Sequence, residues 1–276
     1  MGASTVTNTG STTIQGNVGL SDPGVSITGF STASSTVVNG PGSTGLIDGP
    51  GLVAGTIYIS GPVPNLAETD ALAAYNLLKG KPVTTDLTGK ILGSSGTPGY
   101  SSLTPGVYYF SSTAELDGTL TLDFGATPDA LFVFQIGTAL TTDSASEIVA
   151  LGGGSNSGIY WLTGVTGGLG TGAATLGTTT AFAGNILALD AITLNNSATI
   201  LCGRAISLDK AVTLDTNTIS NDCAIANGGT DTSDFGSGGF SGNGVGGAPV
   251  PEPATLTLFG ASLAGLRSFR RRKAKT

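Results

Sequence analysis

One phrase recurs along this chain and limits its possible folds more than any other feature. A hydroxyl-rich run is followed by a single Ile or Phe and then by a Gly within three residues. Clear copies occupy residues 11–17, 179–185 and 197–204, and a degenerate copy occupies residues 217–220. Such repetition predicts a stack of similar coils, because each turn of a β-solenoid buries its apolar side chains only by stacking on the next turn.

A second phrase has the same rhythm. Residues 191–195 recur as residues 211–215, and residues 121–123 recur in related form as residues 141–143, in both cases after 20 positions. No helical pattern lies inside this period, so short strands joined by turns are expected. The two phrases together predict a β-solenoid.

Composition agrees with this fold and excludes several functions. The chain has 276 residues, with 45 Gly, 11% charged residues and no His, which suits short strands and tight turns. A net charge of −7 and a pI near 4.4 argue against a nucleic-acid partner, since phosphate binding depends on clustered Lys and Arg. The acids are scattered and no nucleophile sits beside a base, so we expect no enzyme, no cofactor and no metal.

One helix is expected at about residues 65–79. Asn65 is a suitable N-cap with Glu68 three residues later, and Gly80 followed by Pro82 ends the pattern. Its predicted apolar stripe contains Ala67, Ala71, Ala74, Tyr75 and Leu78. The segment 131–136 has apolar residues at both its odd and its even positions, as a strand covered on both sides would have. It is therefore expected to face this helix.

The chain divides into three parts. Residues 1–226 are expected to form the solenoid, residues 227–249 a flexible Gly- and Ser-rich linker, and residues 250–276 a separate C-terminal segment. That segment resembles the bacterial PEP-CTERM sorting signal: the motif Pro251, Glu252 and Pro253 precedes an apolar run at 254–266 and a basic tail. The resemblance implies export, processing by an exosortase and transient residence in the membrane; a plain tail anchor is the alternative.

Cys202 and Cys223 are 21 residues apart, which is about one coil. Successive turns would place them side by side, so a disulfide is expected if the compartment is oxidising. Two buried free thiols are the alternative.

The hydroxyl residues of the repeated phrase predict a flat surface. If Ile14, Phe182, Ile200 and Ile219 point inward, strand alternation sends their neighbours outward in two rows. The expected contact grid consists of Ser11, Thr13, Thr179, Ala181, Ser197, Thr199, Thr216 and Thr218. Such a neutral grid could order water into an ice-like layer; alternatively, Thr is simply a good strand former on a solvated face.

Further characteristic segments occupy residues 103–108, 120–123, 131–137, 140–142, 176–178, 182–188, 192–195, 203–205 and 211–219. Together these segments, between residues 5 and 223, are similar to the ice-binding protein family of cold-adapted bacteria, fungi and algae. The resemblance implies a right-handed, discontinuous β-solenoid of triangular section with an α-helix packed alongside. It also implies adsorption to ice without catalysis or a cofactor, through a flat face rich in Thr, Ser, Ala and Asn. The motif Thr-Ala/Gly-x-Thr/Asn of some members is matched at residues 138–141 and 163–166.

These observations lead to one main hypothesis. We expect an exported, extracellular or cell-surface protein that binds ice or ordered water as a monomer. The alternative is a non-enzymatic adhesion protein of the exopolysaccharide layer, and a polysaccharide-active enzyme has little support.

Overall fold

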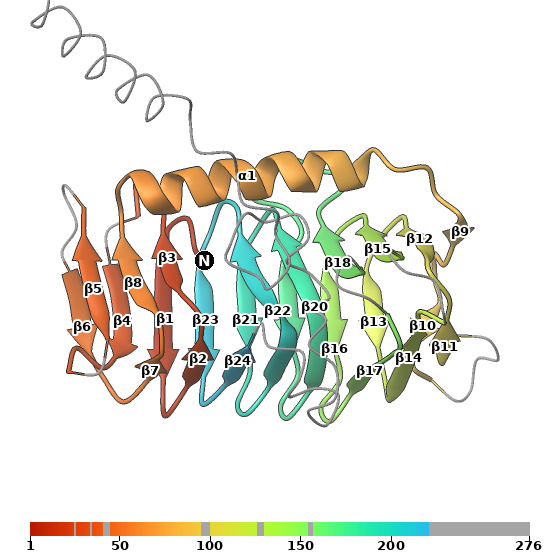
Figure 1. Cartoon of the computed structure of the whole chain (residues 1–276). Coiled ribbons are helices and arrows are strands. Elements are labelled where there is room, and N and C mark those ends of the chain that lie inside the picture. Colours follow the sequence, from red (N-terminus) through yellow and green to blue (C-terminus); the bar gives the residue numbers. More distant parts are fainter. Residues whose placement is uncertain are drawn as a thin grey trace, which may run out of the picture.

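The computed structural model describes residues 1–220 except positions 25, 34, 41–44, 95–99, 126–129 and 154–156. The expected linker at 227–249, the C-terminal segment at 250–276 and Cys223 lie outside the described residues. The described chain winds parallel strands around three faces, with one helix lying along much of one side (Figure 1). This arrangement confirms the predicted β-solenoid with a helix alongside.

The first face is a nine-strand parallel sheet. In spatial order its strands are β10 (Ile91–Leu92), β13 (Ala114–Leu116), β16 (Leu140–Thr142), β19 (Ala174–Leu176), β21 (Ile192–Leu194), β23 (Val212–Asp215), β1 (Thr5–Thr9), β4 (Ser26–Phe30) and β6 (Gly45–Asp48). We call its outer side the nine-strand face.

A twelve-strand sheet covers the second face and part of the third. Its main path runs through β7 (Leu52–Val53), β2 (Thr13–Gln15), β24 (Thr218–Ser220), β22 (Thr199–Ser207), β20 (Ala181–Ala188), β18 (Gly158–Thr163), β15 (Leu131–Ile136), β12 (Gly106–Phe110) and β9 (Thr85–Asp86). A branch from β20 adds β17 (Glu147–Leu151), β14 (Thr119–Asp123) and β11 (Ser102–Leu103). We call the surface of β7, β2, β24, β17, β14, β11 and the first halves of β22 and β20 the second face.

Two long strands, β20 and β22, bend between these faces, and glycine permits the bend. Gly184 has φ +100°, a backbone conformation that side chains disfavour. A Cβ on Gly203 would lie 1.9 Å from the carbonyl oxygen of Gly184, so the two backbones touch at this corner. The glycine of the repeated phrase therefore marks a corner of the solenoid.

The third face lies under the helix. It is completed by a three-strand sheet of β3 (Val18–Leu20), β8 (Thr56–Ile59) and β5 (Thr36–Asn39). Helix α1 (Pro62–Lys79) buries Ala71, Tyr75 and Leu78 against this face. Val133 of β15 belongs to the same apolar cluster, so β15 contacts the helix as its two-sided apolar pattern predicts.

The start of the helix differs from the sequence prediction. The N-cap is Gly61, and α1 begins at Pro62, three residues before Asn65. Proline suits this first turn because its missing N–H would have no helical partner there. Asn65 instead accepts a hydrogen bond from the Asp22 N–H at 2.8 Å. Ala67 is exposed, so it does not belong to the buried stripe.

The other end of α1 is held by a buried glutamine. Gln135 Nε2 donates to the carbonyl oxygens of Leu78, Lys79 and Lys81 at 3.0–3.1 Å. Gly80 is the C-cap, as expected. Within the part of the chain that the structure describes, no helix is long and apolar enough to cross a bilayer.

The order of coils in space differs from their order in sequence. β1 pairs with β23, and β2 pairs with β24, so the N-terminal coil stacks directly on the last described coil. Helix α1 and the connection after it then carry the chain back along the body to β9 near the opposite end (Figure 1). The solenoid is therefore discontinuous, with a seam in its middle where the two parts of the chain meet.

Candidate ice-contact face

The nine-strand face carries an unbroken row of six threonines. Strand register places them directly beside one another in the order Thr141, Thr175, Thr193, Thr213, Thr7 and Thr28. We call this row the threonine ladder. Neighbouring strands lie about 4.8 Å apart, so six rungs cover roughly 24 Å. All six side chains are at least partly exposed.

A second row of small residues runs beside the threonine ladder. Two positions before each ladder threonine, on the same side of the sheet, the chain has Ala139, Ala173, Ala191, Ala211, Thr5 and Ser26. Along a strand, side chains on one face repeat at about 6.6–6.8 Å. The two rows thus form a flat grid of methyl and hydroxyl groups without a charge.

The ladder has definite ends. In the same register, Glu115 of β13 follows Thr141, and Ile47 of β6 follows Thr28. A carboxylate binds its hydration water tightly, whereas an aliphatic side chain does not. The neutral grid is therefore bounded by an acid at one end and by an exposed Ile at the other.

The structure brings together half of the grid expected from the repeated phrase. Thr13, Thr218, Thr199 and Ala181 lie in register on the second face, in that order. Their row ends at Leu52 on one side and at Glu147 on the other. The next row on this face contains Gln15, Ser220 and Leu201, so its side chains differ widely in size and chemistry.

The other four predicted positions lie at a corner and do not form a strand row. Thr179, Ser197 and Thr216 have φ between +55° and +60°. Ser11 follows Gly10, which has φ +76° and occupies the equivalent turn. A left-handed residue interrupts the alternation of side chains, and this is why strand periodicity misplaced these positions.

The corner is held from inside by Asn217. Its Nδ2 donates to the carbonyl oxygens of Asn195 and Ala198, both at 2.9 Å. Its Oδ1 accepts from the Asp215 N–H at 2.6 Å, and its own N–H donates to Thr12 Oγ1 at 2.9 Å. Because Asn217 is 1% exposed, these bonds replace water and fix the angle between the two faces.

The threonine ladder was missed by the interpretation of the sequence, although its signal was present. The repeat of residues 191–195 at 211–215 contains Thr193 and Thr213, and the motif at residues 138–141 contains Ala139 and Thr141. The second motif match, at residues 163–166, does not lie on the nine-strand face. Thr163 ends β18 and is buried.

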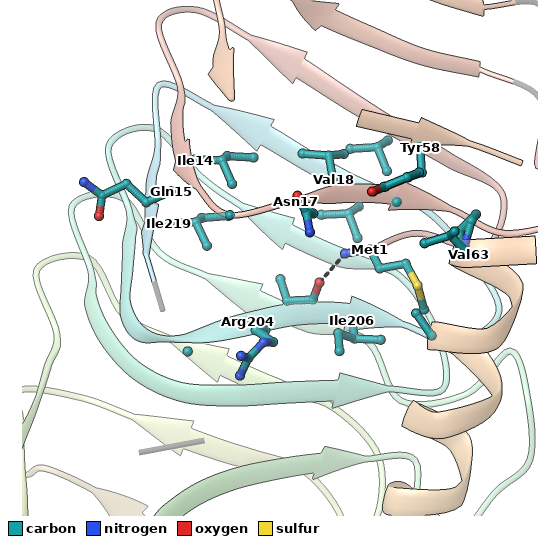
Figure 2. A pocket seen from close by; sticks show the side chains of 18 of the residues that line it. Met1, Ile14, Gln15, Asn17, Val18, Tyr58, Val63, Arg204, Ile206 and Ile219 are labelled. Atoms are coloured by element: carbon teal, nitrogen blue, oxygen red, sulfur yellow. Dashed lines mark hydrogen bonds between the residues drawn. The ribbon is translucent and has the colours of Figure 1, made fainter. Parts of the chain in front are cut away.

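A cavity of about 580 Å³ opens at the seam between the N-terminal coil and the last described coil. Figure 2 shows Ile14, Ile219, Val18 and Ile206 around it, with Met1 in the middle. The amine of Met1 donates to the carbonyl oxygen of Ala205 at 2.6 Å. Loss of hydration at this site lowers the pKa of the amine to about 5.

The expected disulfide has a partial answer. The described residues contain no free cysteine; Cys202 is buried, and Cys223 lies outside them, so the pairing stays a prediction. The part of the chain that the structure describes contains no group of Cys, Asp and Glu suited to holding a metal ion.

The fold and the grid define a class: a discontinuous β-solenoid with a helix on one side and an exposed threonine face on another. Residues 1–220 match the ice-binding-like family, and the chain belongs to this family. Residues 249–273 match the PEP-CTERM protein-sorting motif, which indicates export to the cell surface. Pro251, Glu252 and Pro253 lie in this match.

Individual relatives support the same assignment. An ice-binding protein of Nostoc sp. (strain HG1) is 44% identical over 223 residues, which span 81% of this chain and 71% of the relative. A crystal structure of an ice-binding protein from an Antarctic biological consortium is 34% identical, with a TM-score of 0.62 over 79% of this chain and 85% of that chain. One from the Antarctic ascomycete Antarctomyces psychrotrophicus is 28% identical, with a TM-score of 0.61 over 80% and 92% of the two chains.

Proposed function

We propose that this protein adsorbs to ice through the threonine ladder and the row of small residues beside it. The observation that carries the proposal is the unbroken register of six threonines across six paired strands. The names of its relatives support ice as the ligand.

The geometry explains how such a face would hold ice. Methyl and hydroxyl groups in register offer water a regular pattern of weak contacts, without ions that impose their own hydration. Each contact is weak, but a rigid face makes all of them at once. Their combined effect makes desorption very slow, so the adsorbed protein would block ice growth and recrystallisation or attach a cell to ice.

The second face is the competing site within the same function. It carries Thr13, Ala181, Thr199 and Thr218 in register, with Ser11, Thr179, Ser197 and Thr216 along the adjoining corner. We favour the nine-strand face because its row is longer and the row two positions before it is uniformly small; the row two positions after it contains Thr9, Asp215 and Asn195. The row on the second face is shorter and lies beside Leu201 and Gln15.

Delivery to the surface follows from the C-terminal motif. We propose that an exosortase processes residues 250–276, that this segment resides briefly in the membrane, and that the solenoid acts as a monomer outside the cell. Association with exopolysaccharide is compatible with the same delivery.

A matched pair of substitutions tests which face binds ice. Thr193 and Thr199 belong to one coil, are six residues apart and are both half-buried. Thr193→Tyr should abolish ice shaping and recrystallisation inhibition, because a protruding ring breaks the flat plane. Thr199→Tyr should leave both intact. Circular dichroism and the melting temperature should change little in either variant, since both rings reach solvent.

The reverse result would move the site to the second face. Full activity in both variants would mean that neither face binds ice. Binding to extracted polysaccharide without any effect on ice would support the adhesion alternative instead.

A further inference from the structure

The threonine ladder is assembled from two distant parts of the chain. Thr141, Thr175, Thr193 and Thr213 come from the C-terminal coils, while Thr7 and Thr28 come from the N-terminal ones. The junction is the pair Thr7 and Thr213, 206 residues apart, whose hydroxyl oxygens lie 3.4 Å from each other. The proposed contact face therefore exists only when the seam is closed.

The cavity lies directly behind this junction. Its lining includes Val6, which precedes Thr7 on β1, and Val212, which precedes Thr213 on β23. Both valines point inward, as alternation requires for neighbours of outward threonines. Figure 2 shows the cavity between Ile14 and Val18 of the N-terminal coil, Ile219 of β24 in the last described coil and Ile206 of β22 in the coil before it.

The buried neighbours of other ladder threonines do not border the cavity. Ile192 and Leu194, which flank Thr193, are at most 1% exposed and do not line the cavity. Ala174 and Leu176, which flank Thr175, are equally buried and equally remote from it. A side chain that borders a void lacks packing partners on one side, so its position is less strongly fixed.

Backbone hydrogen bonds of residues 1–3 hold the seam in addition to the β1–β23 ladder. Besides the Met1 amine, the Ser207 N–H donates to the Met1 carbonyl oxygen at 3.0 Å. The Ala3 N–H donates to the Lys210 carbonyl oxygen at 2.9 Å. These bonds fix residues 1–3 beside β22 and the start of β23, but they do not fill the space behind Val6 and Val212.

We propose that Val6 and Val212 are positioning residues for ice adsorption: their packing around the seam cavity sets the alignment of Thr7 with Thr213. The pair Thr7 and Thr213 is then the least rigid part of the threonine ladder. How well this pair is aligned limits how flat the whole ladder is. This inference rests on the proposed function of the nine-strand face. It assigns a role in ice binding to two residues that do not touch ice.

Hydrogen exchange in the native full-length protein tests the softness directly. Backbone amides of β1 and β23 at the seam should exchange about tenfold faster than amides of β19 and β21 in the same sheet. Equal or slower exchange at the seam would overturn the inference, whatever the ice activity is.

Matched substitutions test the link to ice. Val6→Ala or Val212→Ala should lower recrystallisation inhibition per folded molecule by roughly threefold near 0 °C, where both variants remain folded. The control is Val133→Ala, which removes the same two methyl groups from a fully buried site under the helix. It should lower the melting temperature by a similar amount without changing activity per folded molecule.

The outcomes separate the two proposals. If Thr193→Tyr abolishes activity but Val6→Ala and Val212→Ala behave like Val133→Ala, the contact face stands and the positioning role fails. If Thr193→Tyr retains activity, the contact face itself is wrong. A Val6→Ile variant gives a further check, since better filling of the cavity should slow exchange in β1 and raise activity.

Discussion

The nine-strand face and the second face are wound from the same coils, yet they present different surfaces. On the first, six consecutive strands place Thr at the same register position. On the second, Thr13, Thr218 and Thr199 are followed by Ala181 and then by Glu147. Both faces are rich in Thr, so composition alone does not separate them. What separates them is whether the small neutral residues continue from coil to coil without interruption.

The largest expected effect comes from breaking the corner that both faces share. Asn217→Ala removes the donor to the carbonyl oxygens of Asn195 and Ala198, the second of which is buried, and the acceptor of the Asp215 N–H. Leaving these groups unpaired should lower the free energy of unfolding by about 3 kcal/mol. Chemical denaturation measures this loss, and activity should fall with it because the faces lose their fixed angle.

Asn196→Ala is the control for this substitution. Asn196 is exposed and accepts a bond from the hydroxyl of Ser197, so its loss should cost less than about 0.5 kcal/mol. Similar losses in the two variants would show that the buried network does not hold the corner.

An intermediate effect is expected from making the second face resemble the first. Glu147→Thr, Ala181→Thr and Leu52→Thr together would continue the row through Thr199, Thr218 and Thr13. In a Thr193→Tyr background this triple variant should regain roughly a third of the native recrystallisation inhibition, because a second multivalent plane is created. No recovery in a folded variant would mean that continuity of the row is insufficient.

The smallest effect is expected at the acidic end of the ladder. Glu115→Thr adds a seventh rung beside Thr141 and removes a carboxylate, so thermal hysteresis should rise by about 1.2- to 1.5-fold. Glu115→Gln removes the charge without supplying a methyl and a hydroxyl group, so it should raise thermal hysteresis less than Glu115→Thr does. A loss of activity with Glu115→Thr would show that the carboxylate contributes to binding.

Much of this architecture could be predicted from local spacing. The position of Ile14, Ile200 and Ile219 within the repeated phrase placed Thr13, Thr199 and Thr218 correctly in one outward row. The helix and its packing against the strand Leu131–Ile136 also followed from apolar periodicity. These features depend on alternation within a strand or a helix, which is written into neighbouring residues.

Features set by contacts between distant coils could not be predicted in the same way. The left-handed conformation of Thr216 and Ser197 is imposed by the corner, since neither residue favours it alone. The pairing of Thr7 with Thr213 depends on where the N-terminal coil docks. Helix α1 returns the chain toward the β10 end of the sheet, and the C-terminal coils then stack in the same direction as the N-terminal coils until β23 meets β1. The threonine ladder can therefore be recognised only once the N-terminal coils, helix α1 and the C-terminal coils are all placed in space.

The position of Ser220 has a mechanical consequence. Residues 221–276 continue from β24, which lies in the middle of the body and is hydrogen-bonded to β22 on one edge and to β2 on the other. A cell tethered through this tail would load the protein at its centre. Tension on β24 would then be resisted by the hydrogen bonds to both β22 and β2, whereas a strand at the end of the sheet would be held along one edge only. The body would also extend on both sides of its point of attachment.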